Sequence, residues 1–246
     1  MWTPAGDPAR LDCSSFGTPG QVRVAILPIR LHQATDRIPD ITAIDLVDAS
    51  ESEKFATAKR AEEHASGRWL LSWVLRRTMP DLDLGSIEVV RDEHRAPELS
   101  WLKGTSRNDP LPSFSITTSY QKALVAICGS ASRIGIDAEP LDAPRSPNLL
   151  SMMSSDEEFA RLESSFQTQG TAIVNRVWTA KEAVLKALGR GMSIPLSRIE
   201  VLGEDERILS GVEFENERID LSTFETSHGA ERYVVSVAFR SVGSSG

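Results

Sequence analysis

Alternation of apolar and polar residues predicts several strands along the chain. Residues 21–28 read QVRVAILP, with Val22, Val24 and Ile26 at every second position. Because the side chains of a strand point alternately to its two faces, this spacing predicts a strand. Similar patterns predict strands at 86–90 and 133–138, a hairpin of 113–117 with 123–128, and a strand-rich stretch over 198–239.

Helical spacing of apolar residues predicts a long helix over 50–79. Ser52 and acidic residues stand at its start, and Pro80 follows its end. Its second half carries four apolar residues that share one face, which are Trp69, Leu70, Trp73 and Val74. This segment therefore has the pattern of a helix that packs one side against a core.

The clearest predicted helix spans 171–188, and Gly189 follows it in the position that glycine favours after a helix. A shorter helix is predicted over 156–166. The order β–α–β–β followed by β–α–α–β–β predicts an α+β protein with two similar halves. We place these halves at 20–132 and 133–240.

Composition narrows the class of protein. The chain has 246 residues, of which 40% are hydrophobic and 25% charged, as in ordinary globular proteins that bury a core. Its net charge of −8 opposes a role in nucleic-acid binding, because such proteins usually carry a strong basic excess.

Two cysteines, Cys13 and Cys128, provide neither a disulfide scaffold nor a cysteine-based zinc site. No apolar run approaches the roughly 18 residues of a membrane-spanning helix, and no secretory signal pattern is visible. We therefore expect a cytoplasmic protein with no membrane partner.

Two carboxylates lie close together in the predicted strand that contains G-I-D-A-E. Asp137 and Glu139 are two positions apart and would share one face of the strand. Paired carboxylates repel each other unless a cation lies between them, and hard oxygen ligands suit Mg²⁺. Taken alone, the pair is more often two surface acids at a strand end.

A second motif, W-T-A-K-E-A-x-x-K-A, lies on the clearest helix. Glu182 and Lys186 are four positions apart and face the same side of the helix. On its own, this spacing is more often a routine surface ion pair than a functional site.

A third motif, K-R-A-E-E-H-A-S-G-R at 59–68, places Arg60 and Arg68 about two helical turns apart. Arginines that share a helix face in this way suit phosphate oxygens. The ordinary alternative is a solvated helix face on which Glu62 and Glu63 balance the charge.

In combination, the three motifs resemble the Sfp-type 4′-phosphopantetheinyl transferases, in the branch that serves siderophore and natural-product synthetases. The resemblance covers roughly 20–240. It implies two similar α/β halves related by a pseudo-twofold axis. It also implies transfer of the 4′-phosphopantetheine group of coenzyme A to a serine of an apo acyl or peptidyl carrier protein, with 3′,5′-ADP as the other product.

The resemblance implies a role for each motif residue. Mg²⁺, or Mn²⁺ in its place, would be bound by Asp137, Glu139 and Glu182. Glu182 would act as the base and Lys186 would lie beside the pyrophosphate, so these two are the predicted catalytic residues. The predicted contacts to coenzyme A are Arg60, Arg68, Arg95, Thr117, Thr118, Lys181 and Lys186.

The hairpin departs from the family pattern, which usually reads S-x-[ST]-H-[SC]. Thr118 stands where relatives place a histidine that contacts a phosphate of coenzyme A, and none of the chain's four histidines has an obvious substitute position in the sequence. This departure leaves open a paralogue that binds coenzyme A or a carrier protein with little turnover. We otherwise expect an active enzyme that is a monomer, because both halves lie in one chain.

Overall fold

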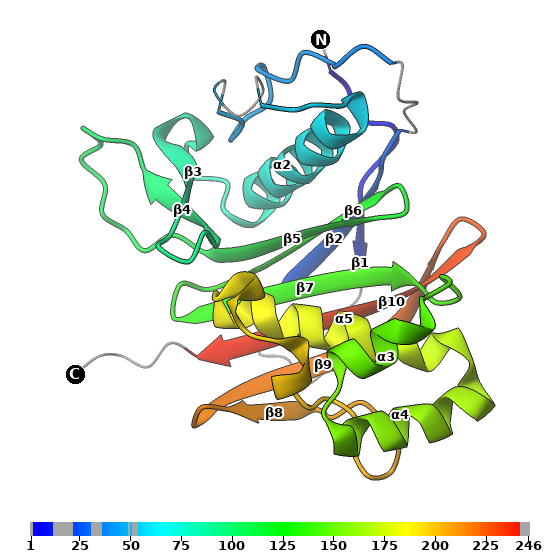
Figure 1. Ribbon diagram of the computed structural model, residues 1–246. Coiled ribbons are helices and arrows are strands. Elements are labelled where there is room, and N and C mark those ends of the chain that lie inside the picture. The colour runs from blue at the N-terminus through cyan, green and yellow to red at the C-terminus, as the bar shows by residue number, and fades with distance from the viewer. Residues whose placement is uncertain (1, 12–21, 31–35, 49, 51–53, 242–246) are drawn as a thin grey trace. The chain divides into compact units, whose positions relative to one another are not determined.

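The structure is a computed structural model that describes residues 2–11, 22–30, 36–48, 50 and 54–241 (Figure 1). The chain divides into two compact units. Unit 1 takes the described residues of 1–15, 19–92 and 97–130, and unit 2 takes those of 93–96 and 131–246.

Unit 1 is a four-stranded antiparallel sheet, ordered β1-β2-β6-β5, with the long helix α2 packed on it and a separate two-stranded ribbon of β3 and β4. Its elements are β1 (Ala9–Leu11), β2 (Arg23–Pro28), α2 (Ala58–Thr78), a 3₁₀ turn (Leu84–Ser86), β3 (Ile87–Arg91), β4 (Pro97–Trp101), β5 (Ser113–Ser119) and β6 (Lys122–Cys128). The predicted hairpin is confirmed, and both turn residues, Tyr120 and Gln121, have positive φ.

Unit 2 is a second four-stranded antiparallel sheet, ordered β7-β10-β9-β8, with helix α5 packed against β7 and β10. Its elements are β7 (Ser132–Pro140), α3 (Pro147–Met153), α4 (Asp156–Gln169), α5 (Thr171–Leu188), two 3₁₀ turns (Gly191–Ser193 and Leu196–Arg198), β8 (Gly211–Phe214), β9 (Glu217–His228) and β10 (Glu231–Ser241). Gly189 ends α5 with a φ of 70°, as the sequence predicted.

The two units follow the same plan. Apart from the short edge strand β1 of unit 1, each unit runs from a strand through a long helix, and its sheet also contains a hairpin with one strand beside that starting strand. In unit 1 these elements are β2, α2, β5 and β6, and in unit 2 they are β7, α5, β9 and β10. The predicted α+β class is therefore confirmed.

The predicted start of the first helix is wrong. Helix α2 begins at Ala58, where the side chain of Thr57 accepts a hydrogen bond from the amide of Arg60 at 3.3 Å, and its first turn holds no acidic residue. The predicted cap, Ser52, lies outside the described residues. A hydroxyl side chain at either position can cap a helix, so the local pattern alone did not decide between them.

The core of each unit lies between its sheet and its long helix. Leu70, Leu71 and Leu75 of α2 are fully buried against unit 1's sheet. Val177 and Val184 of α5 are fully buried in unit 2. Of the four α2 residues predicted to face the core, Leu70 and Val74 are buried, whereas Trp69 and Trp73 are half-buried at its edge.

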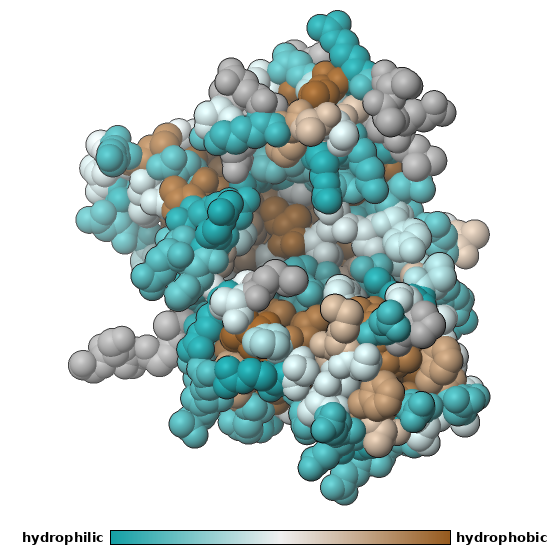
Figure 2. Space-filling model, viewed as in Figure 1, coloured by the Kyte–Doolittle hydropathy of each residue, from teal (hydrophilic) through white to brown (hydrophobic). Residues whose placement is uncertain are grey.

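The surface shown in Figure 2 is mostly hydrophilic, with hydrophobic side chains gathered over the helices of unit 2. The large exposed apolar residues of these helices are Met152 on α3 and Phe166 on α4. Among the described residues, no helix combines the length and apolar character needed to cross a membrane.

Candidate active site

Close packing of α5 on β7 brings together the two motifs of unit 2. A Cβ atom added at Gly135 would lie 1.9 Å from the carbonyl oxygen of Ala183 and 2.6 Å from the amide nitrogen of Ala187. Only glycine can occupy this position at such a separation. The close approach places the carboxylate two residues further along β7 beside the side chains of α5.

Lys186 bridges these two elements. Its ammonium donates hydrogen bonds to the Asp137 carboxylate at 2.8 Å and to the carbonyl oxygen of Ile136 at 2.9 Å. The Asp137 side chain is 8% exposed and that of Lys186 is 29% exposed, so the pair faces a partly open region. Lys186 therefore makes a contact between α5 and β7, rather than only the routine surface pair with Glu182 that the spacing alone suggested.

Arg145 holds the second carboxylate of β7. Its guanidinium lies 3.1 Å from the Glu139 carboxylate, donates to the Asn175 side chain at 2.6 Å, and stacks over the ring of Trp178. Asn175 in turn donates to two backbone carbonyls of the segment after β7. Nothing in the sequence marked Arg145, because it lies in a proline-rich connector outside every motif.

Glu182 lies on α5 beside these charges. Burial raises the pKa of its carboxyl group, Lys186 opposes that shift, and the neighbouring carboxylates of Asp137 and Glu139 add to it. A carboxylate with an elevated pKa is better suited to accept a proton near neutral pH. The structure therefore brings Glu182 near Asp137, Glu139 and Lys186, as the motifs predicted.

This group of residues has the donor chemistry of a Mg²⁺ site, since it offers three carboxylates in a partly buried setting. In the described parts of the chain, however, no three ligating side chains lie close enough to hold a metal ion together. Two of the carboxylates are instead bound to Lys186 and Arg145. The carboxylates fit a divalent cation by their chemistry, and binding one requires them to exchange these partners.

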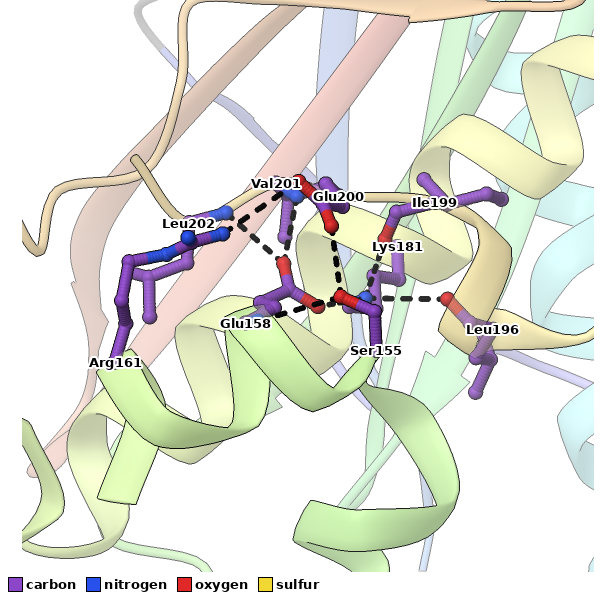
Figure 3. Close-up of polar contacts among 9 residues, drawn as sticks. All are labelled: Ser155, Glu158, Arg161, Lys181, Leu196, Ile199, Glu200, Val201 and Leu202. Carbon is purple, nitrogen blue, oxygen red and sulfur yellow. Dashed lines mark hydrogen bonds and ion pairs between the residues drawn. The ribbon is translucent and has the colours of Figure 1, made fainter. Parts of the chain in front are cut away.

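Lys181 lies away from this group, and its predicted contact with coenzyme A is wrong. Its side chain is 0% exposed, and its ammonium is enclosed by the Glu158 carboxylate and two backbone carbonyls (Figure 3). Those carbonyls belong to Leu196 and Ile199. Adjacent residues of a helix point to different sides. Lys181 is therefore buried, whereas Glu182 is half-buried on another side of α5.

The buried pair of Lys181 and Glu158 also binds the backbone of the segment that follows α5. One oxygen of Glu158 accepts hydrogen bonds from the amides of Val201 at 2.8 Å and Leu202 at 3.1 Å (Figure 3). Burial lowers the pKa of Lys181, while Glu158 favours its charged form. Lys181 is therefore a structural residue that ties α5 to α4 and to the segment at 196–202.

Four of the predicted coenzyme A contacts meet in unit 1. They line one cavity of about 280 Å³ between α2, β5 and the β3–β4 ribbon. The predicted residues of this cavity are Arg60, Arg68, Thr117 and Thr118. The other lining residues, which were not predicted as contacts, are Phe55, Glu63, His64, Gly67, Arg91, Pro97, Phe114 and Ile116.

The cavity combines one buried and one exposed arginine. Arg68 is 5% exposed, whereas the side chain of Arg60 is 72% exposed and lies 3.1 Å from the Glu63 carboxylate. Arg95, the remaining predicted contact, is exposed in the turn between β3 and β4 and is not among the described residues that line the cavity. Gly67 allows β5 to approach α2, because an added Cβ would lie 2.8 Å from Ile116.

Residues 133–238 match the family model described as the 4′-phosphopantetheinyl transferase superfamily. The predicted resemblance to 4′-phosphopantetheinyl transferases is therefore confirmed at the level of the superfamily for this part of the chain, and the Sfp-type branch stays a prediction.

Named relatives agree with this match. A phosphopantetheinyl transferase of Thraustochytrium sp. is 28% identical over 193 residues, covering 70% of this chain and 63% of that protein. A 4′-phosphopantetheinyl transferase of Bacillus subtilis is 26% identical over 96 residues, covering 39% of this chain and 42% of that protein. The chain thus spans less than two thirds of the length of either relative.

Among solved structures, an apo-ACPS of Chronobacterium ammoiniagenes is 17% identical. It covers 46% of this chain and 99% of that chain, with a TM-score of 0.31.

Proposed function

We propose that this protein transfers the 4′-phosphopantetheine group of coenzyme A to a serine of an apo carrier protein. The observation that carries this proposal is the group formed by Asp137, Glu139, Glu182 and Lys186 within the region that matches the superfamily. A divalent cation held by the three carboxylates would neutralise charge on the pyrophosphate.

The chain's own residues have separate roles in the proposed reaction. The serine oxygen forms a bond to the phosphorus that carries the pantetheine arm, and the bond from this phosphorus to the bridging oxygen breaks. Glu182 takes the serine proton as the base. Lys186 donates hydrogen bonds to phosphate oxygens, and 3′,5′-ADP leaves with the electrons of the broken bond.

In unit 1, Arg60 and Arg68 are proposed to hold phosphate groups of coenzyme A, with Thr117 and Thr118 as hydroxyl donors. The support is that these four side chains line one cavity. Arg95 is proposed as a further, exposed phosphate contact. The proposed partner is an acyl, peptidyl or polyketide carrier protein of a natural-product pathway, the proposed location is the cytoplasm, and the proposed assembly is a monomer.

The test is incubation with coenzyme A, Mg²⁺ and a panel of apo carrier proteins, scored by intact mass. We expect the phosphopantetheine mass on at least one carrier, loss of activity with EDTA, and recovery with Mg²⁺ or Mn²⁺. Glu182→Gln should abolish transfer. Glu163→Gln, which changes an exposed carboxylate of α4, is the matched control and should retain it.

Two outcomes would contradict the proposal. If coenzyme A binds while every carrier stays unmodified, the chain is a binding paralogue. If Glu182→Gln transfers as fast as the wild type, the assignment of the carboxylate group is wrong.

A further inference from the structure

The cavity of unit 1 contains His64, a residue of the motif at 59–68 to which the sequence assigned no role. His64 lies on α2 between Arg60 and Arg68, one turn from each, and all three side chains line the same cavity. Residues at this spacing follow one side of a helix. The two arginines and the imidazole therefore form a continuous stripe that faces β5.

The charges around His64 favour an anion. The charged lining residues on α2 are Arg60, Glu63 and Arg68, and β3 adds Arg91. Strand β5 contributes only the uncharged Thr117 and Thr118 among its polar side chains in the lining. Glu63, the one carboxylate in the described lining, lies 3.1 Å from Arg60 and 3.7 Å from Lys59. The lining thus carries three arginines against one carboxylate that already has cationic neighbours.

The position of His64 is well defined. Its ring packs against that of Phe55, with centroids 5.0 Å apart, and the residue is half-buried. Packing of this kind holds an imidazole in one orientation at a lower entropic cost than a long, exposed side chain. Phe55 lines the cavity as well, so the two rings form part of the same wall.

We propose that His64 is a ligand-contact residue of this cavity and that its ring donates a hydrogen bond to a phosphate monoester of a nucleotide. This inference rests on the proposed function for the identity of the nucleotide. A volume of about 280 Å³ suits the phosphorylated part of such a ligand. Among the described lining side chains, an imidazole is the one group whose charge ordinarily changes near neutral pH, and the proposed hydrogen bond to phosphate is stronger when the ring is protonated.

The test compares 3′,5′-ADP with 5′-AMP by calorimetric titration at pH 6 and pH 8. We expect the wild type to bind 3′,5′-ADP more tightly than 5′-AMP. His64→Gln should weaken 3′,5′-ADP binding about fivefold at pH 6, because a charged donor is replaced by a neutral one, with a smaller loss at pH 8. The ligand's own titration affects both proteins equally, so the difference between them isolates the ring.

Two variants control for structural effects. His94→Gln changes an exposed histidine that is not among the described lining residues, and it should leave both affinities unchanged. His64→Lys keeps a cation at the position and should restore 3′,5′-ADP affinity at both pH values. If His64 only packed against Phe55, lysine at this position would not restore the affinity for 3′,5′-ADP.

The outcomes separate this inference from the proposed function. Equal affinity of the wild type and His64→Gln for 3′,5′-ADP at both pH values would overturn the inference, even if carrier proteins are modified. A His64-dependent affinity in a protein that modifies no carrier would support the inference while the proposed function fails.

Discussion

At the scale of single residues, the carboxylates of unit 2 carry an electrostatic cost in the metal-free protein. Glu182 is partly buried, and its pKa is raised by that burial and by Asp137 and Glu139, against the opposing effect of Lys186. Its ionised form is therefore less favourable in the folded state than in the unfolded chain. Because the folded pKa is raised, this penalty is present above that pKa and disappears as the pH falls below it.

Replacement of the charge should consequently stabilise the metal-free protein. Glu182→Gln is expected to raise the melting temperature in EDTA at pH 7.5, and to remove any further rise on addition of Mg²⁺. The measurement is thermal unfolding with and without Mg²⁺, with Glu163→Gln as the control. A Mg²⁺-induced rise that persists in Glu182→Gln would show that the ion binds elsewhere.

A second residue-scale prediction concerns Cys128. Burial raises the pKa of its thiol to about 11, although a hydrogen bond with Ser113 partly opposes the shift. Since the thiolate is the reactive form, Cys128 should resist iodoacetamide at pH 8 in the folded protein and react after denaturation. Peptide mass spectrometry distinguishes the two states, and rapid alkylation of native Cys128 would show that β6 opens readily.

At the scale of elements, the contact between β7 and α5 decides the geometry of the carboxylate group. An added methyl at Gly135 would meet backbone atoms of α5, which cannot move aside as a flexible side chain does. The helix would have to shift away from the strand. A shift of this kind separates Asp137 from Lys186 and disturbs the packing of the unit 2 core.

Gly135→Ala should therefore destabilise the protein by about 3 kcal/mol or more, at the upper end of the cost of overpacking. Chemical denaturation followed by circular dichroism gives the free energy of unfolding. Gly6→Ala is the control, because the nearest atom to its added Cβ would be a proline side-chain carbon at 3.3 Å, with no backbone atom among the nearest contacts. A loss below about 1 kcal/mol for Gly135→Ala would mean that α5 tolerates a displaced position.

The buried ion pair between α4 and α5 supports a further prediction. Lys181→Met leaves the Glu158 carboxylate buried without its cation, at a cost of about 3–5 kcal/mol. The double variant Lys181→Met with Glu158→Gln should recover much of this loss, because glutamine keeps an acceptor for the amides of Val201 and Leu202. If the double variant lost as much stability as the two single variants together, the two side chains would not interact.

At the scale of the whole molecule, ligand binding should raise the free energy of unfolding. A ligand present at about 100 times its Kd adds about 2.7 kcal/mol to the folded state. For a chain of this size, that corresponds to a rise of roughly 5–10 °C in melting temperature. We expect coenzyme A to produce a rise of this order, and Arg68→Met to reduce it at the same ligand concentration. No rise at saturating coenzyme A would contradict the proposed substrate.

The sequence by itself determined the elements whose signals are local. The hairpin β5–β6, the strand β7 and the helix α5 follow from periodicity and from a glycine at a helix end, because each depends on neighbours a few residues away. Spacing along a strand or a helix also set which side chains of the acidic and helical motifs share a face. The predicted roles of Asp137, Glu182 and Lys186 came only from the resemblance of the combined motifs to a family, because each spacing alone is typical of surface residues.

Only the tertiary structure decided which side chains meet across elements. Lys181 is buried because its partner Glu158 lies on another helix, and its place in the motif carried no sign of that pairing. Arg145 reaches Glu139 from a connector, and His64 reaches the cavity of unit 1 because β5 packs against α2. Such contacts join residues far apart in sequence, so their partners are defined by packing, which local periodicity does not encode.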